Sequence, residues 1–431
     1  MHVRTTRRSA GLAALGALCM AAQAFAQAQS VTLDEAISMA LQAQPAMVQA
    51  RGQVTNAAAA KRQAVGNWLP SLSAGSGMSS NSTNRFDQET QRTVVGSSTA
   101  YSANISTSLV LFDGLTRLYD GKAASADATA ADASLVNQRF QTILQVKQTY
   151  FSALAAEELV RVSDRQMERA TEQLDVSRQK LAAGTATRSD TLRSSVEVAN
   201  ARLQKLNAET QLAIAGANLA RLIGIDGVVG TVFEDRLLEV AVIDTAAVRQ
   251  EALAQSPAIY QAEAQANAAQ AQFNAAFGQY LPRVSASYSR TWAGSEFITQ
   301  WNPAWSFRIS ASWPLFNGFT RELNRTRSAV ARDNQRAVAQ DTRRQVNAQI
   351  TQYLASLEAA EIRLEIALAN RIANDEDLRV QQERYRLGAA TILDVLVSQV
   401  GLDQSEVDIV QARLDYLVAK AEIEAVIGRE L

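Results

Sequence analysis

Two long stretches of the sequence, 115–183 and 319–387, have the pattern of uninterrupted helices. Neither contains proline, glycine is nearly absent, and Ala, Gln, Glu, Arg and Leu dominate. Each run of about 70 residues would extend about 100 Å at 1.5 Å per residue, which is unusual in a globular domain. Helical patterns resume at 188–223 and 392–427, so each long helix is predicted to reverse into a returning helix.

The last returning helix carries apolar residues at spacings of three, four and seven. This spacing predicts a coiled-coil seam that packs against a neighbouring helix. The predicted seam residues are Leu396, Val400, Val407, Val410, Leu414, Leu417 and Ala421.

Between the helices, four short windows alternate apolar and polar residues, as strands do. They are 71–79, 103–112, 284–292 and 306–313. We predict two hairpins, at about 69–112 and 282–316, whose strands are joined by polar loops near 80–98 and 293–304. Arg290 falls on a position that should be apolar, and the alternation does not explain it.

All five tryptophans lie in or beside these hairpins. Strands of about ten residues, apolar on one face and Ser- or Asn-rich on the other, with aromatic residues near their ends, are typical of an outer-membrane β-barrel. The alternative is a soluble sandwich, but four short strands make a small core for so much helix. The expected membrane-interface aromatics are Trp68, Tyr280, Trp292, Trp301, Trp305 and Trp313.

Four strands cannot close a membrane barrel, and an open edge would leave backbone amides unpaired in hydrocarbon. The chain is therefore predicted to complete a barrel with copies of itself. Two copies would supply eight strands and three would supply twelve, with room for a lumen. These arguments predict an oligomer without fixing the number of subunits.

The sequence also contains an internal repeat. Gly184, Thr187 and Asp190 recur 204 residues later as Gly388, Thr391 and Asp394, and LFDGLTR at 111–117 recurs as LFNGFTR at 315–321. Gly114 and Gly318 in these segments are predicted to make sharp strand-to-helix transitions. The predicted organisation is repeat 1 at 27–225 with a tip near 184–190, a linker at 226–248, and repeat 2 at 249–431 with a tip near 388–394.

Both glycine motifs fall where a long helix must reverse. A glycine just past a helix end takes the left-handed conformation readily. Thr187 and Thr391 can then cap the returning helices, with Asp190 and Asp394 at the third helical position of each. Turn chemistry therefore accounts for these residue types before any function is assigned.

The first 26 residues have the pattern of a secretory signal peptide, with a basic start, an apolar run and a small-residue cleavage site. Lipidation at Cys19 is not expected, because Leu18 precedes it where a small residue is needed. The only His and the only Cys leave with this segment, which removes the usual catalytic bases, metal ligands and thiols. The remaining 39 basic and 43 acidic residues argue against a nucleic-acid partner. We expect no catalytic residues, cofactor or metal.

The order of these features, with LPSLSA, LFNG and RYRLGAATILDVL, resembles the TolC family of outer-membrane efflux proteins. The resemblance implies a mainly α fold with membrane β structure. Four strands per chain would contribute to a trimeric, 12-stranded outer-membrane β-barrel, continued by a long periplasmic α-helical coiled-coil barrel. It implies a passive exit duct in the bacterial outer membrane, in contact with outer-membrane lipid. Its partners would be a periplasmic adaptor protein and an inner-membrane pump of a tripartite efflux or type I secretion system.

By the same resemblance, the two tips surround the periplasmic entrance, where Tyr385, Gly388 and Asp394 match family positions that act in closure. Ala390 and Val397 depart from charged residues found in some members. We therefore hypothesise that Arg188 pairs with Asp394 of a neighbouring hairpin when the entrance is closed. Alternatives are a non-conducting coiled-coil envelope tether or adhesin stem, and a hydrolase that acts through carboxylates. The cargo, adaptor and pump are not indicated.

Overall fold

The computed structural model describes residues 30–89, 91–233, 244–297 and 301–431, in two compact units. One unit combines the described parts of 1–48, 138–254 and 347–431, and the other combines 49–137 and 255–346. The predicted signal peptide lies outside the described residues.

In chain order the elements are β1 Ser30–Val31, α1 Leu33–Ala43, α2 Pro45–Gly66, β2 Ser71–Asp87, β3 Arg92–Phe112, α3 Thr116–Ala182, α4 Arg188–Ile223, β4 Gly230–Thr231, α5 Thr245–Gln255, α6 Pro257–Ala275, the 3-10 helix η2 Ala276–Tyr280, β5 Arg283–Gly294, β6 Asn302–Ser312, α7 Thr320–Arg386 and α8 Ile392–Ile427.

The internal repeat is visible in the lengths of the helices. Helices α3 and α7 each contain 67 residues, and the returning helices α4 and α8 each contain 36. Helices α7 and α8 begin and end 204 residues after α3 and α4, which confirms both the repeat and the predicted long helices. In the described part of the chain, no helix has an apolar stretch long enough to cross a membrane.

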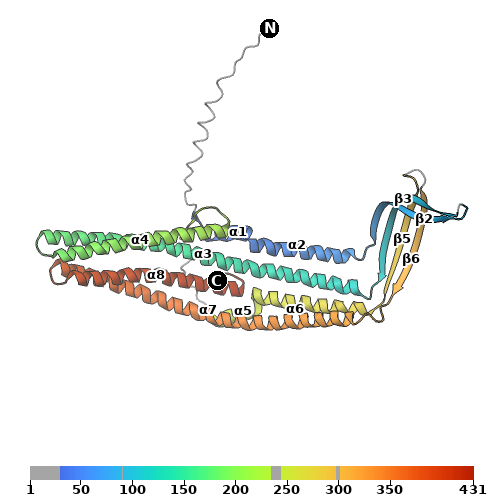
Figure 1. The fold of residues 1–431 in the computed structure, drawn as a ribbon. Helices are drawn as coiled ribbons and strands as arrows, with labels where there is room; N and C mark the ends of the chain where they lie inside the picture. Colours follow the sequence, from blue (N-terminus) through green and yellow to red (C-terminus); the bar gives the residue numbers. More distant parts are fainter. Residues whose placement is uncertain (1–29, 90, 234–243, 298–300) are drawn as a thin grey trace, which may run out of the picture. The chain divides into compact units, whose positions relative to one another are not determined.

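The predicted strands form one antiparallel sheet in the order β2-β3-β5-β6 (Figure 1). The long polar loop predicted at 80–98 is wrong, because β2 continues to Asp87 and β3 begins at Arg92. Polarity alone misled the prediction there. Ser, Thr and Asn side chains suit a strand that is exposed on both faces, and the backbone amides of this segment are paired across the hairpin.

The register of the sheet separates an apolar face from a polar one. One row across the four strands is Leu72, Thr107, Tyr288 and Phe307, whereas the adjacent row is Ser73, Ser106, Ser289 and Ser306. Within the chain the large apolar side chains of the first face are exposed, Leu72 by 76% and Phe307 by 59%. Strands β2 and β6 each have one edge without a strand partner among the described residues.

The seam predicted for the last helix is only partly correct. Val400 is 56% exposed, although it was predicted to belong to the packed seam. The buried face of α8 instead repeats every seven residues and lies on a neighbouring side of the helix. Valine and leucine also lie on the exposed side of α8, so apolar spacing alone did not distinguish the inner face. The buried repeat is Val395, Leu402, Ile409, Tyr416 and Ile423.

Helix α3 anchors the start of the described chain through a buried tyrosine. Strand β1 pairs in parallel with β4, and the fully buried Tyr150 hydroxyl reaches the carbonyl oxygens of Val31 at 3.1 Å and Val232 at 2.8 Å. Lys147, one helical turn earlier, forms a buried ion pair with Glu424 of α8, with 2.6 Å between Nζ and Oε2. These contacts fasten α3 to segments that are remote in the sequence.

Replacing Tyr150 by phenylalanine tests this anchor. Tyr150→Phe leaves the polar groups of the β1–β4 pair without the buried hydroxyl, which should lower the free energy of unfolding by about 1–3 kcal/mol. Thermal unfolding of the detergent-solubilised protein should show a lower Tm. Tyr260→Phe is the matched control, because Tyr260 is 49% exposed and its change should stay within about 0.5 kcal/mol. Equal Tm values for wild type and Tyr150→Phe would contradict this role.

Candidate functional site

The first candidate site is the turn between α3 and α4. Gly184 adopts a left-handed conformation, with φ of +73°, directly after the end of α3. The amides of Gly184 and Thr185 donate to the carbonyls of Leu181 and Lys180, at 3.0 and 2.9 Å, so they satisfy groups that a helix end leaves free. This hydrogen-bonding pattern is a Schellman motif, and it accounts for the glycine.

Thr187 then caps α4, as the sequence indicated. Its Oγ1 accepts from the amide of Asp190 at 3.3 Å, and the Asp190 carboxylate accepts from the amide of Thr187 at 2.8 Å. This reciprocal pair is a capping box with aspartate at the third helical position. Arg188, the first residue of α4, is exposed beside it.

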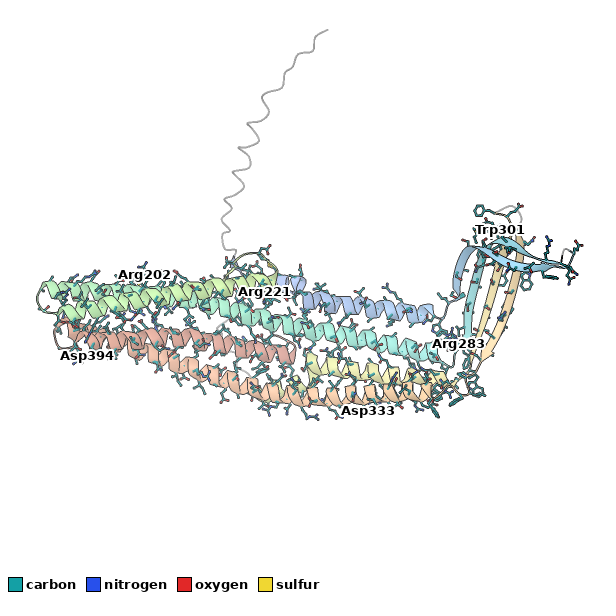
Figure 2. All side chains as sticks on the ribbon, in the orientation of Figure 1. Arg202, Arg221, Arg283, Trp301, Asp333 and Asp394 are labelled. Carbon is teal, nitrogen blue, oxygen red and sulfur yellow. The ribbon has the colours of Figure 1, made fainter. Side chains whose placement is uncertain are left out.

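The turn between α7 and α8 repeats this chemistry. Gly388 has φ of +80°, and the amide of Ala389 donates to the carbonyl of Arg384. Thr391 and Asp394 form the second capping box, in which Asp394 Oδ2 also accepts from the Thr391 hydroxyl at 2.8 Å. These hydrogen bonds lower the pKa of the Asp394 carboxyl below its usual value. Asp394 is exposed at this turn and is therefore charged at neutral pH (Figure 2).

The structure brings the two turn regions together through Tyr385. This side chain is only 7% exposed and packs in an apolar cluster with Leu378, Ile392, Val395 and Leu402. Burial raises the pKa of the Tyr385 hydroxyl, and the negative charge of Asp190 in the other hairpin adds to the effect. Tyr385 therefore remains neutral while it links hairpin 1, formed by α3 and α4, to hairpin 2, formed by α7 and α8.

Lys180 of α3 contacts Tyr385 and so connects hairpin 1 to hairpin 2. The sequence analysis did not identify this lysine. Its Nζ lies 4.0 Å from the centre of the Tyr385 ring and donates a hydrogen bond to the Tyr385 carbonyl. The lysine thus satisfies a carbonyl at the C-terminal end of α7 while its charge rests on an aromatic face. Its position in the last turn of α3 was the available signal, because cations favour helix C-termini.

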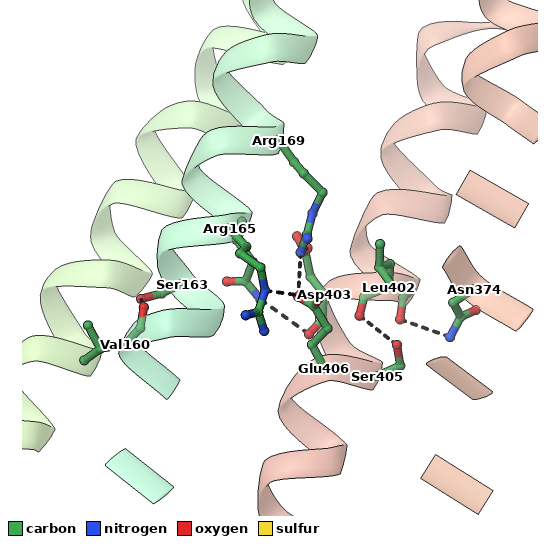
Figure 3. A network of polar contacts seen from close by, with 11 residues as sticks. Val160, Ser163, Arg165, Arg169, Asn374, Leu402, Asp403, Ser405 and Glu406 are labelled. Carbon is green, nitrogen blue, oxygen red and sulfur yellow. Dashed lines mark hydrogen bonds and ion pairs between the residues drawn. The ribbon is translucent and has the colours of Figure 1, made fainter. Parts of the chain in front are cut away.

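A partly buried ionic network joins the same two hairpins further along the helices. Figure 3 shows Arg169 of α3 extended toward α8, where it contacts Asp403 at 2.6 Å and Glu406 at 2.7 Å. Arg165 lies 3.5 Å from Glu406. Burial raises the pKa of Asp403, and its hydrogen bond to Arg169 offsets only part of that effect. Such a network mainly fixes how α3 and α8 align, because the cost of removing the charges from water offsets much of their attraction. Removal of one partner would destabilise the structure, since it would leave an uncompensated charge.

The predicted Arg188–Asp394 pair does not form within the described chain. The amide and the hydroxyl of Thr391 both donate to Oδ2 of Asp394, and no ion pair joins Arg188 to Asp394 among the described residues. The hypothesis concerned neighbouring hairpins, so it stays a prediction for an assembly of several chains.

The strand-to-helix transitions are formed as the two glycines suggested. Gly114 and Gly318 have φ of +70° and +64°. A Cβ at Gly114 would lie 2.6 Å from the carbonyl oxygen of Gly278, so glycine is needed there for space as well as conformation. The positive φ extends to Leu115 and Phe319, which makes each transition a two-residue left-handed turn.

Two arginines that the sequence analysis left without a role hold these transitions together. Arg117 binds Asp113 at 2.9 Å and lies 4.4 Å above the Trp68 ring. Arg321 lies 4.9 Å above the Tyr280 ring and donates to the carbonyl of Pro314. The recurring arginine of LFDGLTR and LFNGFTR was the sequence signal for this arrangement.

The remaining expected interface aromatics lie along the second hairpin. Trp305 and Trp313 are 72% and 60% exposed, and the Trp313 indole donates to the carbonyl of Tyr280 at 3.2 Å. The Trp301 indole donates to the carbonyl of Glu296 in the connection between β5 and β6. Trp292 lies beside the Arg290 guanidinium, 5.2 Å from it. Among the described residues, no group of three or more acidic, His or Cys side chains is placed to hold a metal ion.

The left-handed glycines allow a direct test of the hairpin turns. Gly388→Ala should destabilise the turn by about 1–2 kcal/mol, because an alanine Cβ disfavours φ of +80°. Hydrogen exchange of the amides in 384–395 should be accelerated. Gly121→Ala is the matched control, since Gly121 lies inside α3 with open space around its Cα and should become more stable by about 0.5–1 kcal/mol. Unchanged exchange in Gly388→Ala would rule out the strain argument.

Comparison with known proteins identifies the family. The family described as outer membrane efflux protein matches residues 36–225 and 248–429. Protein CyaE of Bordetella pertussis is 28% identical over 387 residues, which cover 86% of this chain and 78% of CyaE. The alkaline protease secretion protein AprF of Pseudomonas aeruginosa is 25% identical, over 70% of this chain and 64% of AprF. The CmeC outer membrane channel of Campylobacter jejuni shares the fold, with a TM-score of 0.78, 17% identity, and coverage of 92% of this chain and 85% of CmeC. Since the family match spans most of the sequence, the chain belongs to the outer membrane efflux protein family.

Proposed function

We propose that this chain forms, as a homotrimer, the outer-membrane exit duct of a tripartite export system. The observation that carries the proposal is the four-stranded sheet, with an exposed apolar face, a serine-lined polar face and two edges that have no strand partner among the described residues. An apolar face suits lipid and a polar face suits a water-filled lumen. Paired edge to edge, three copies would supply twelve strands and leave no backbone group unpaired in the membrane.

The helices supply a second argument for association of identical chains. Helix α4 exposes a stripe of apolar residues at approximately coiled-coil spacing. Helix α7 also exposes isoleucine side chains. Stripes of this kind pack against a partner helix, and copies of the same chain would provide it. The exposed stripe residues are Leu192, Val196, Leu203, Leu206 and Ile214 of α4 and Ile362, Ile366 and Ile372 of α7.

In this trimer the two turns of each chain would surround the periplasmic entrance, six turns in all. Lys180, Tyr385 and the Arg169 network support a design in which both hairpins of one chain move together. The contacts that change on opening would then lie between chains. Arg188 and Asp394 are exposed at the turns and are suited to such a contact.

The partners follow from membership of the family and the names of the relatives. Relatives include a secretion protein for an alkaline protease, a toluene efflux pump outer membrane protein and a pyoverdine export outer membrane protein. We propose that a periplasmic adaptor and an inner-membrane pump deliver the cargo to this chain, and that the chain itself performs no chemistry. The small residues Ala182, Ala183, Ala186, Ala389 and Ala390 at the turns would allow adaptor helices to approach closely.

Electrical recording tests the proposed duct. Purified protein added to a planar bilayer should produce discrete conductance steps, and its mass in detergent should correspond to three chains. A trimer that inserts without conducting would support the tether instead, because a tether needs no lumen. A folded monomer stable in aqueous buffer would contradict the proposal.

Removal of the charge at either turn tests the proposed closure. Arg188→Ala and Asp394→Asn should each raise the time-averaged conductance about two- to fivefold, since an exposed ion pair contributes about 0.2–1 kcal/mol. Arg202→Ala is the control, because Arg202 is an exposed arginine on the same helix as Arg188, away from the turn (Figure 2). If both charge variants conduct as the wild type does, the pairing is wrong.

A further inference from the structure

An arginine lies within the apolar face of the sheet. Arg290 of β5 is directly opposite Ile105 on β3 and Trp305 on β6, so all three side chains share one face. Ile105 is 45% exposed, Trp305 is 72% exposed, and Arg290 is exposed between them. The register thus places a permanent positive charge on the surface that, under the proposed function, faces lipid.

No carboxylate in the described part of the chain neutralises this charge. The contact found for the guanidinium there is the Trp292 ring, 5.2 Å from its central carbon. Trp292 and Trp305 therefore flank the arginine, and an indole combines an apolar body with a polar N–H group. An unpaired guanidinium between two indoles is a suitable site for an anion at a boundary between apolar and polar surroundings.

The position of Arg290 along the strand agrees with such a boundary. Arg290 is four residues before Gly294, where β5 ends and the short connection to β6 begins. In the proposed duct this connection faces the cell exterior, because the opposite ends of the strands lead into the periplasmic helices. A long arginine side chain near that end can extend its guanidinium to the membrane surface, whereas the same charge at the bilayer centre would be costly.

We propose that Arg290, flanked by Trp292 and Trp305, binds the phosphate of an anionic lipid headgroup in the outer leaflet. The inference rests on the proposed function, which assigns the apolar face to lipid. The planar guanidinium can donate two parallel hydrogen bonds to phosphate oxygens, and the indoles pack against the boundary between headgroup and acyl chain. A trimer would carry three such sites.

The neighbouring strand provides a matched control. Arg308 of β6 is opposite Ser287 of β5 and therefore belongs to the polar face. It carries the same charge in the same sheet, but the proposed duct directs it away from lipid. Loss of Arg308 should leave lipid binding unchanged, whereas loss of Arg290 should weaken it.

Native mass spectrometry of the detergent-solubilised trimer, titrated with lipid A or phosphatidylcholine, measures this binding. Arg290→Gln and Arg290→Ala should each weaken lipid A binding about fivefold or more, in line with the contribution of one arginine at an anionic surface. Arg308→Ala should bind as the wild type does, and phosphatidylcholine should be insensitive to all three changes. Inorganic phosphate at millimolar concentration should not displace lipid A.

Equal lipid A binding by the wild type and both Arg290 variants would overturn the site. Equal losses in Arg308→Ala, or displacement by inorganic phosphate, would also overturn it, because they would indicate nonspecific charge or a free-anion site. Conductance of the wild-type protein is recorded in parallel. If the wild type conducts and the Arg290 variants bind lipid A as well as the wild type does, only this inference is contradicted. If the protein never inserts into the bilayer, the proposed function and the lipid site are both contradicted.

Discussion

The backbone amides and carbonyls at the two edges of the sheet are the constraint on which the proposed assembly depends. Strands β2 and β6 have pairing partners on one side only within the described chain. In water such edges are tolerable, but in hydrocarbon each unpaired group costs several kcal/mol. The exposed apolar face favours hydrocarbon, so the chain satisfies both requirements only if a second copy continues the sheet at each edge. Backbone hydrogen bonds between the edge strands of neighbouring copies would then close the sheet into a barrel.

The helical segments meet a different requirement, because a hairpin of helices this long must be held in register. The Schellman motifs at Gly184 and Gly388 and the two capping boxes satisfy the helix ends locally. Members of the seven-residue repeat of α8 pack against α7 within hairpin 2, and the pairs that Arg169 makes with Asp403 and Glu406 hold one hairpin against the other. Several contacts thus hold the two hairpins of one chain together, and the charges exposed at their turns are available for contacts between chains in the proposed assembly.

What could be predicted from the sequence was the chemistry that acts over short distances along the chain. The capping of α8 was predictable because Gly388, Thr391 and Asp394 act within seven residues, and the strands were predictable from alternation. The Lys180–Tyr385 contact was not, because its partners are 205 residues apart and each is an ordinary helical residue alone. The position of Val400 was predicted wrongly because α8 carries apolar residues on more than one side, and Leu393, Val397 and Val400 are exposed. Arg290 conflicted with the apolar pattern in the sequence, and the register places it on the apolar face.

The most direct test of the central claim is disulfide trapping between the two edges of the sheet. Cys19 is the only cysteine of the sequence, so a chain with Cys19 replaced, one cysteine at Ser73 of β2 and another on the polar face of β6 gives an unambiguous readout. The β6 cysteine is moved through positions 304, 306, 308 and 310 to find the register. The account predicts that oxidation in native membranes yields covalent dimers and trimers, and no larger species, for at least one pair. Monomers alone at every register would contradict it.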